Sequence, residues 1–262
     1  MEFRSKGSVS IQDYMGDDCT IVNAARVSFA RNGTFEIGGA ERGLIRFLLE
    51  NRHGTPFEHV TFTFLVECPI FVAREWFRHR IGSFNEVSGR YSELAPVFWV
   101  PEVPRTQRGK AGAYHFTPIG DPVVQARTNI TLEALYGLAW QAYEALLSDG
   151  VAKEVARTVL PVGTFTRFYW TVNLRSLFNF LSLRNAPQAQ AEIRELAQDI
   201  ILGQLRLVIA TLTIEEINKD REKFMSLINA NVGEETYTAF KRWDIGDIVG
   251  VAWHIACGTC AQ

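Results

Sequence analysis

The stretch VTFTFLVECPIFVAREWFRHR, residues 60–80, carries the pattern that decides the fold. Residues 60–68 alternate in polarity, so that five apolar side chains share one face of an extended chain: Val60, Phe62, Phe64, Val66 and Cys68. This alternation predicts a strand with one buried face. Pro69 follows at a position where helices accept proline as their first residue, and we therefore predict a helix over 69–80.

Helical periodicity recurs on both sides of this unit. It predicts helices at 20–31, with Asp17 and Asp18 as cap candidates, and at 40–51, 123–148, 152–160, 174–184 (capped by Asn173), 188–217 and 234–243. Short strands are predicted at 97–100 and 164–172, a loop at 81–94 and an exposed, mobile excursion at 105–122. Single helices do not regularly link the strands, which indicates a helix-rich α+β fold around a small, mostly antiparallel sheet. No linker or repeat interrupts the chain, so we expect one domain over residues 1–262.

Composition excludes several classes of protein. The 262 residues are 47% hydrophobic and 21% charged, which is typical of a globular chain and not of a disordered one. The net charge of −2 argues against non-specific binding to nucleic acid, so any anion needs a local basic site. Apolar runs are too short for a membrane span, the four cysteines are too few for a disulfide scaffold, and no secretory signal is visible. We expect a cytoplasmic protein that binds neither membrane nor nucleic acid.

The basic run Arg78-His79-Arg80 is the sharpest chemical feature of the sequence. On a helix, at about 100° per residue, three consecutive side chains point in three directions, which a solvated face does not require. One interpretation is a helix end whose cations complement the dipole. The other is an anion site, in which arginines including Arg90 donate to a phosphate while Gly89 lets the backbone approach.

Arg78-His79-Arg80, seven residues and then Ser88 resemble the signature of the flavin-dependent thymidylate synthases. Further segments resemble this family in the same order: 24–29, 55–59, 156–161, 166–173 and 175–184. The resemblance covers roughly residues 9–200, and the loop at 105–122 and the tail after about 218 match nothing in it. It implies the family's own mixed α/β fold and a homotetramer with sites at subunit interfaces.

The resemblance also implies the reaction and its site. The reaction is the reductive methylation of dUMP to dTMP, with 5,10-methylenetetrahydrofolate as one-carbon donor, FAD reduced by NADPH as hydride source, and no metal. The implied flavin-site residues are Thr55, Arg78, His79, Arg80, Glu86, Asn173, Arg175 and Asn179, with His53 near flavin and folate. The implied nucleotide-site residues are Glu75, Arg78, Glu86, Val87, Ser88, Gly89, Arg90, Arg157 and Arg184.

Arg184 is the predicted catalytic residue. In the family the matching arginine favours the N3-ionised uracil, and a permanently charged guanidinium suits that developing anion. Without the resemblance, Arg184 would be an ordinary cation at a helix end. Ser88 is interpreted as a nucleotide ligand and not as a nucleophile, because no histidine pairs with it as a base. Cys19 and Cys68 are interpreted as core residues.

Two residues depart from the family pattern, and alternatives stay open for the C-terminal cysteine pair and for the function. Glu75 replaces a common glutamine and cannot donate to phosphate, and Gln188 stands where some members have histidine. The Cys257-x-x-Cys260 pair near the end of the chain is interpreted as a packed helix end, with a redox or zinc role as the alternative. The competing functions are a catalytically silent nucleotide- or RNA-binding protein and a folate- or flavin-binding enzyme such as a tRNA uracil methyltransferase.

Overall fold

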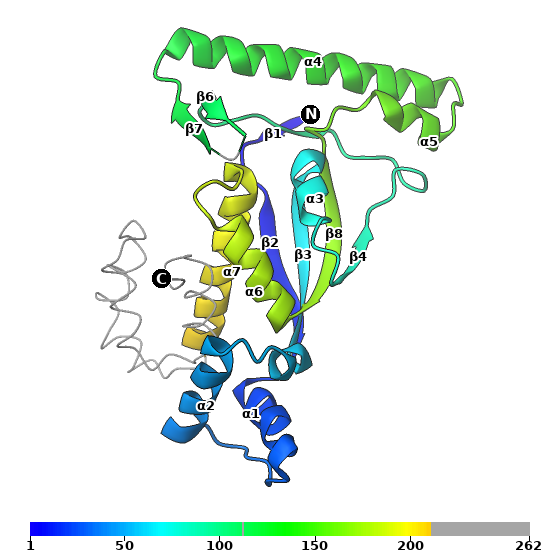
Figure 1. Cartoon of the computed structure of the whole chain (residues 1–262). Helices are drawn as coiled ribbons and strands as arrows, with labels where there is room; N and C mark the ends of the chain where they lie inside the picture. The colour runs from blue at the N-terminus through cyan, green and yellow to red at the C-terminus, as the bar shows by residue number, and fades with distance from the viewer. Residues whose placement is uncertain (112, 211–262) are drawn as a thin grey trace. The chain divides into compact units, whose positions relative to one another are not determined.

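The structure is a computed structural model that describes residues 1–111 and 113–210 (Figure 1). The predicted helix at 234–243, the end of the predicted helix at 188–217 and the Cys257/Cys260 pair lie outside the described residues.

Helices and short strands alternate irregularly along the described chain. The α-helices are α1 (Asp18–Arg26), α2 (Gly39–Glu50), α3 (Ile70–Trp76), α4 (Pro122–Ser148), α5 (Lys153–Ala156), α6 (Leu174–Arg184) and α7 (Ala191–Ala210). The 3-10 helices are η1 (Val27–Phe29), η2 (Thr55–His59) and η3 (Arg157–Val159). The strands are β1 (Glu2–Arg4), β2 (Ser8–Met15), β3 (Thr61–Pro69), β4 (Ser83–Glu86), β5 (Val97–Trp99), β6 (Arg105–Lys110), β7 (Ala113–Pro118) and β8 (Phe165–Asn173).

Four strands form one sheet in the order β2-β3-β8-β4, and two further pairs are β1-β5 and β6-β7. The predicted helix-rich α+β class with a small sheet is confirmed. The described residues divide into two compact units. Unit 1 comprises Met1–Val9, Leu65–Trp170 and Gln190–Ile193. Unit 2 comprises Ser10–Phe64, Thr171–Ala189 and the described residues from Arg194 on.

The core of unit 1 is aromatic. Trp76 of α3 meets Trp170 and Phe168 of β8 edge to face, with ring centroids 5.3 and 5.8 Å apart. Helix α4 covers β5 by stacking Tyr136 on Phe98 at 5.0 Å. Large apolar surface buried in this way supplies most of the driving force for folding.

The core of unit 2 confirms two predicted helices. Asp17 caps α1 through a capping box with Thr20, as predicted for one of its two cap candidates. Asn173 caps α6, because its Oδ1 accepts from the backbone N–H of Ser176 at 2.8 Å. Helix α6 buries an apolar stripe, whose members are Leu174, Leu177, Phe178 and Leu181.

Helix α3 is shorter than predicted, because it ends at Trp76 and not at Arg80. Phe77 packs against Phe168 at 4.9 Å and Phe84 at 5.0 Å, while Phe84 itself belongs to β4. The chain has to leave the helix for Phe84 to reach the same aromatic cluster from a strand. The basic run Arg78-His79-Arg80 therefore lies after the helix, and strand β4 lies within the region predicted to be a loop.

The excursion predicted at 105–122 is instead an antiparallel hairpin, in which Arg105 pairs with Pro118 and Lys110 with Ala113. Its side chains are largely exposed, so no apolar alternation marks its strands in the sequence. Arg105 donates to both carboxylate oxygens of Glu192, at 2.7 and 2.9 Å. Burial raises the pKa of the Glu192 carboxyl, but the hydrogen bonds from Arg105 and the backbone outweigh burial, and the pKa is lowered overall.

Strands β1 and β2, near the start of the chain, were not predicted either. Strand β1 pairs in parallel with β5, from Glu2 with Val97 to Arg4 with Trp99. None of the helices in the described part of the chain is long and apolar enough to cross a membrane.

Candidate active site

The predicted nucleotide-site residues of unit 1 lie on the segment from α3 to residue 91 and on η3. Arg78 stands in the turn after α3, where its N–H donates to the carbonyl of Glu75 at 3.3 Å. The side chains of Arg78 and Arg80 are exposed, and His79 is half-buried. Both arginines are therefore accessible to an anionic ligand, without the helical arrangement assumed from the sequence.

Glu86 is held at the end of β4 by the neighbouring strand. The backbone N–H of Val87 donates to the carbonyl of Arg167 at 2.9 Å, and the hydroxyl of Thr166 donates to Glu86 Oε1 at 2.6 Å. Thr166 is 6% exposed, whereas the Glu86 side chain is exposed. One carboxylate oxygen of Glu86 is thus anchored to β8.

Ser88 opens a tight turn, not a catalytic dyad. Its carbonyl accepts from the N–H groups of Tyr91 and Ser92, both at 3.0 Å, and its hydroxyl accepts from the N–H of Arg90 at 3.3 Å. Within the described residues no histidine bonds to this hydroxyl. A serine nucleophile needs a base within hydrogen-bond reach, and the role of Ser88 as a nucleotide ligand stays a prediction.

Gly89 is buried, and the side chain of Arg157 lies where a side chain at position 89 would begin. A Cβ built on Gly89 would lie 3.0 Å from Arg157 Cδ and 3.2 Å from a methyl carbon of Leu94. The close approach predicted for a ligand is therefore made by the side chain of Arg157. This contact brings together two predicted nucleotide-site residues that stand far apart in the sequence.

Arg90 has a partner that the sequence did not indicate. Its Nε donates to Glu154 Oε2 at 3.0 Å, and its guanidinium lies over the ring of Tyr91, 5.8 Å from the centroid. Lys153 holds the same segment, with Nζ 3.6 Å from Glu93 Oε1. Helix α5 therefore orients the arginine that follows Gly89.

The remaining predicted site residues lie in unit 2, around η2 and α6. The exposed side chains of Arg175 and Asn179 stand one turn apart on the face of α6 opposite its buried stripe. His53 and Thr55 are exposed near the start of η2, and the ring of His53 lies 6.0 Å from that of Phe47. The side-chain oxygen of Asn173 accepts the capping hydrogen bond of α6. Asn173 therefore has a structural role that is independent of any ligand.

Arg175 is held by Glu58, whose Oε1 accepts from its Nη1. Arg184 is the last residue of α6 and is half-buried. Its position as a cation in the last turn fits the ordinary dipole interpretation as well as the catalytic one.

Neither described cysteine is poised for nucleophilic attack. Cys68 is fully buried on β3, and burial, with a smaller contribution from Glu86, raises the pKa of its thiol far above the ordinary value. Burial also raises the pKa of the Cys19 thiol, as do the neighbouring carboxylates of Asp17 and Asp18. A thiol with a raised pKa is a poor nucleophile at neutral pH.

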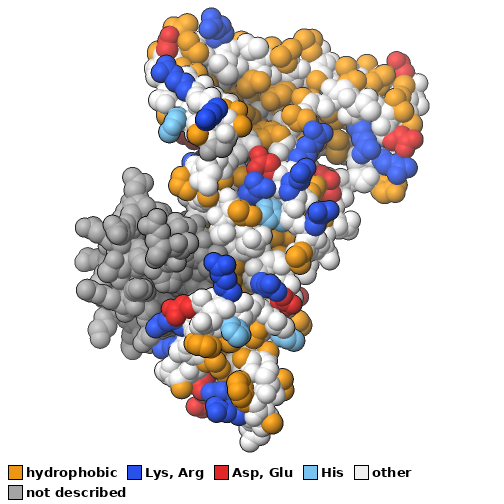
Figure 2. Space-filling model, viewed as in Figure 1, with side chains coloured by type: hydrophobic (Ala, Val, Ile, Leu, Met, Phe, Trp, Pro, Cys, Tyr) orange, Lys and Arg blue, Asp and Glu red, His pale blue; other side chains and the backbone are white. Residues whose placement is uncertain are grey.

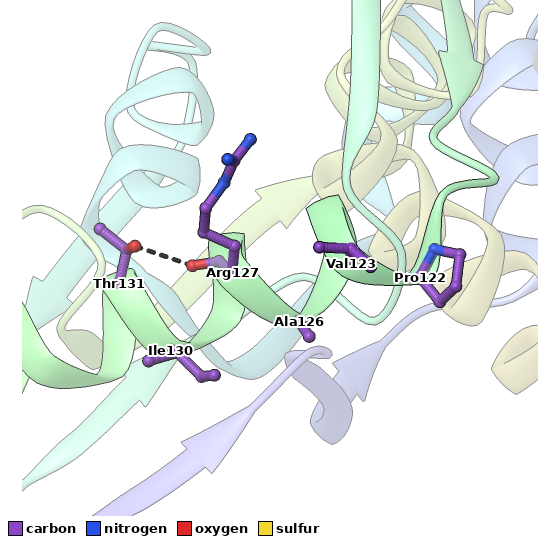
Figure 3. Close-up of a pocket in the computed structure, with 6 residues that line it drawn as sticks. All are labelled: Pro122, Val123, Ala126, Arg127, Ile130 and Thr131. Atoms are coloured by element: carbon purple, nitrogen blue, oxygen red, sulfur yellow. Dashed lines mark hydrogen bonds between the residues drawn. The ribbon is translucent and has the colours of Figure 1, made fainter.

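An open hollow of ≈ 510 Å³ lies elsewhere, on the first turns of α4 (Figure 3). Pro122, Val123, Ala126 and Ile130 line it, and the hydroxyl of Thr131 donates to the carbonyl of Arg127 at 2.7 Å. Its lining is mostly apolar and contains none of the predicted site residues. The hollow is therefore not the candidate active site.

Comparison with known proteins decides the family. The family model described as "Thymidylate synthase complementing protein" matches residues 10–206. A flavin-dependent thymidylate synthase of Thermosipho africanus is 45% identical over 204 residues, which cover 76% of this chain and 87% of that protein. The chain belongs to the flavin-dependent thymidylate synthase family.

A second family member and a solved structure are also similar to this chain. The flavin-dependent thymidylate synthase of Thermus thermophilus is 45% identical over 212 residues, 80% of this chain and 76% of that protein. The crystal structure of a UMP/dUMP methylase, PolB from Streptomyces cacaoi, bound with 5-Br dUMP, has a TM-score of 0.72 and 40% identity. That comparison covers 79% of this chain and 93% of PolB. The resemblance seen in the sequence and the prediction of an enzyme are confirmed.

Among the residues that contact predicted site residues, Gly54, Glu58, Glu154 and Thr166 were not in the predicted set. Glu58 and Thr166 lie inside segments that resemble the family, but nothing in the sequence indicated which site residue each contacts. Glu154 carried no signal beyond standing three residues before Arg157 on a helical turn.

Proposed function

We propose that this chain catalyses the reductive methylation of dUMP to dTMP, with 5,10-methylenetetrahydrofolate as one-carbon donor. The observation that carries the proposal is the packing of Gly89 on Arg157, which joins two separate family segments in one unit. Arginines beside a tight backbone turn suit a phosphate monoester. The membership of the chain in a thymidylate synthase family supplies the reaction.

The nucleotide is held, in this proposal, by arginines, a serine turn and two carboxylates. Arg90 and Arg157 bind its phosphate, while Ser88 and its neighbours supply backbone donors. Glu75 accepts from a ribose hydroxyl. The remaining members of the proposed set are Arg78, Glu86, Val87, Gly89 and Arg184.

Arg184 activates the uracil by stabilising negative charge on its N3-ionised form, which raises the electron density at C5. A guanidinium keeps its charge at any working pH and loses no proton to the pyrimidine. No enzyme nucleophile takes part in this proposal, because no histidine of the described residues bonds to the Ser88 hydroxyl and Cys68 is buried with a raised pKa.

The described residues suit a flavin nucleotide. Arg175 is 58% exposed, and Thr55 and Asn179 are exposed donors on the same unit, a set that fits a pyrophosphate and a polar ring edge. We assign FAD to His53, Thr55, Arg78, His79, Arg80, Glu86, Asn173, Arg175 and Asn179. When bound, the flavin would supply the hydride that it receives from NADPH, and the same proposal assigns His53 to the flavin and folate site.

We further propose a homotetramer of single-domain chains, with sites at subunit interfaces, acting in the cytoplasm. Helix α4 carries exposed apolar side chains on one face, with Val123 at 69%, Ile130 at 65% and Leu138 at 63% exposure. Hydrophobic side chains gather along this helix on the face of the molecule seen in Figure 2. Apolar residues seven or eight apart on one helix suit packing against a second helix.

UMP is a second candidate substrate, favoured by the likeness to a UMP/dUMP methylase. The two nucleotides differ only in the 2′-hydroxyl of the ribose. In this proposal that hydroxyl can donate a hydrogen bond to the carboxylate of Glu75. The test of the proposed function measures methylated product from dUMP and from UMP, each with methylenetetrahydrofolate, FAD and NADPH. NADPH-dependent dTMP supports the proposal. Absence of product despite bound flavin contradicts it and favours the silent nucleotide- or RNA-binding alternative.

A further inference from the structure

Gly54 lies directly against the side chain of Arg175. A Cβ built on Gly54 would lie 2.5 Å from Arg175 Nε, 2.8 Å from Cδ and 2.9 Å from Cζ. The backbone of Gly54 itself is ordinary, with φ −76° and ψ −27°, so any residue could adopt its conformation. The missing side chain therefore makes room for the guanidinium of Arg175, and no backbone strain explains the glycine.

Glu58 fixes the same guanidinium through Nη1. Gly54 and Glu58 belong to one short segment, in which the N–H of Phe57 donates to the carbonyl of Gly54 at 3.1 Å. That segment is secured to α6 by the rings of Phe57 and Phe178, whose centroids are 6.1 Å apart. Arg175 thus rests on a backbone surface and an anionic partner that are both held in place.

This arrangement orients Arg175 more than it stabilises the fold. The Arg175 and Glu58 side chains are 58% and 39% exposed, and ion pairs this open add little to stability. With Nε against Gly54 and Nη1 bonded to Glu58, the second terminal nitrogen of the guanidinium has no hydrogen-bond partner among residues 1–111 and 113–210. A preoriented guanidinium loses less conformational freedom when it binds an anion.

We propose that Gly54 and Glu58 are positioning residues, which hold Arg175 in the orientation that binds the flavin nucleotide. The inference rests on the proposed function, since that proposal places Arg175 in the flavin site. The substitution Gly54→Ala keeps the backbone and drives the guanidinium out of its place. Glu58→Gln keeps the shape of the side chain and removes its charge.

The test titrates FAD into the purified full-length chain and follows quenching of flavin fluorescence. Gly54→Ala is expected to weaken FAD binding about tenfold, and Glu58→Gln about threefold. Gly43→Ala is the matched control, because Gly43 is in α2 and a Cβ there would meet nothing within 4 Å. In an Arg175→Ala background, Gly54→Ala should cause no further loss, since its effect acts through the arginine.

The outcomes separate this inference from the function on which it rests. A wild-type chain that binds no FAD defeats the proposed function itself. If the wild-type chain binds FAD, and Gly54→Ala and Glu58→Gln bind it as tightly as the control variant, only the positioning role is overturned. A further loss from Gly54→Ala in the Arg175→Ala background also overturns it. If Gly54→Ala fails to fold in a thermal scan, Glu58→Gln, an exposed isosteric change, decides the result.

Discussion

Thr166→Val isolates one hydrogen bond of the proposed nucleotide site. The Thr166 hydroxyl donates to Glu86 Oε1 at 2.6 Å from a side chain that is only 6% exposed. Valine has nearly the same shape, so the change removes the donor and leaves no cavity. Hydrogen bonds to charged groups contribute about 1.5–3 kcal/mol, but water can replace the donor at an exposed carboxylate, and we take about 1 kcal/mol. This corresponds to about a fivefold increase in the KM for dUMP.

Steady-state kinetics of dTMP formation would measure this effect as a KM change with kcat nearly constant. Thr166→Ser keeps the hydroxyl and should restore the wild-type KM. Thr171→Val serves as the control, because it removes another cross-strand hydroxyl bond on β8, that with Thr63 at 2.9 Å. An unchanged KM in Thr166→Val, or an equal increase in Thr171→Val, would refute the positioning of Glu86 by Thr166.

Three further predictions address the chemistry, the fold and its pH dependence. Arg184→Lys keeps the charge but loses the planar fork, and turnover should fall about tenfold or more while FAD absorbance shows the flavin still bound. Trp170→Ala should lower the free energy of unfolding by about 3–5 kcal/mol in denaturant titration, since Trp170 is fully buried against Trp76. Because the pKa of Glu192 is lowered in the folded state, its contribution is present above about pH 4.3 and is lost as pH falls through the lowered value. Glu192→Gln should therefore lower the thermal midpoint at pH 7, and the difference from wild type should shrink as the pH falls below about 4.3.

Each element that could be predicted from the sequence buries one face and leaves the opposite face more exposed. Strand 60–68 and helix 174–184 show a clear period because their inward residues, such as Phe64 and Leu177, are apolar throughout. The end of α3 could not be predicted, because it depends on contacts of Phe77 with Phe84 and Phe168 that no local pattern encodes. The hairpin at 105–118 was missed since its exposed strands give no alternation.

The candidate site was partly predictable for a related reason. The basic run and Ser88 form a contiguous signature, whereas other contacts of the site join segments that are distant in the sequence. Thr166 stands 80 residues after Glu86, and Arg175 stands 117 residues after Glu58. Only the folded chain brings such pairs together. The role of Gly54 could not be predicted from the sequence either, because the need for a glycine there depends on the position of the Arg175 side chain.

A single turnover tests the central claim most directly. The enzyme, with its FAD reduced beforehand and all NADPH removed, is mixed under anaerobic conditions with dUMP and methylenetetrahydrofolate, and the products are quantified against flavin reoxidation. The account predicts one dTMP per flavin, with tetrahydrofolate as the folate product, because the flavin and not the folate supplies the hydride. Dihydrofolate as the product, or dTMP formed without flavin reoxidation, would contradict it.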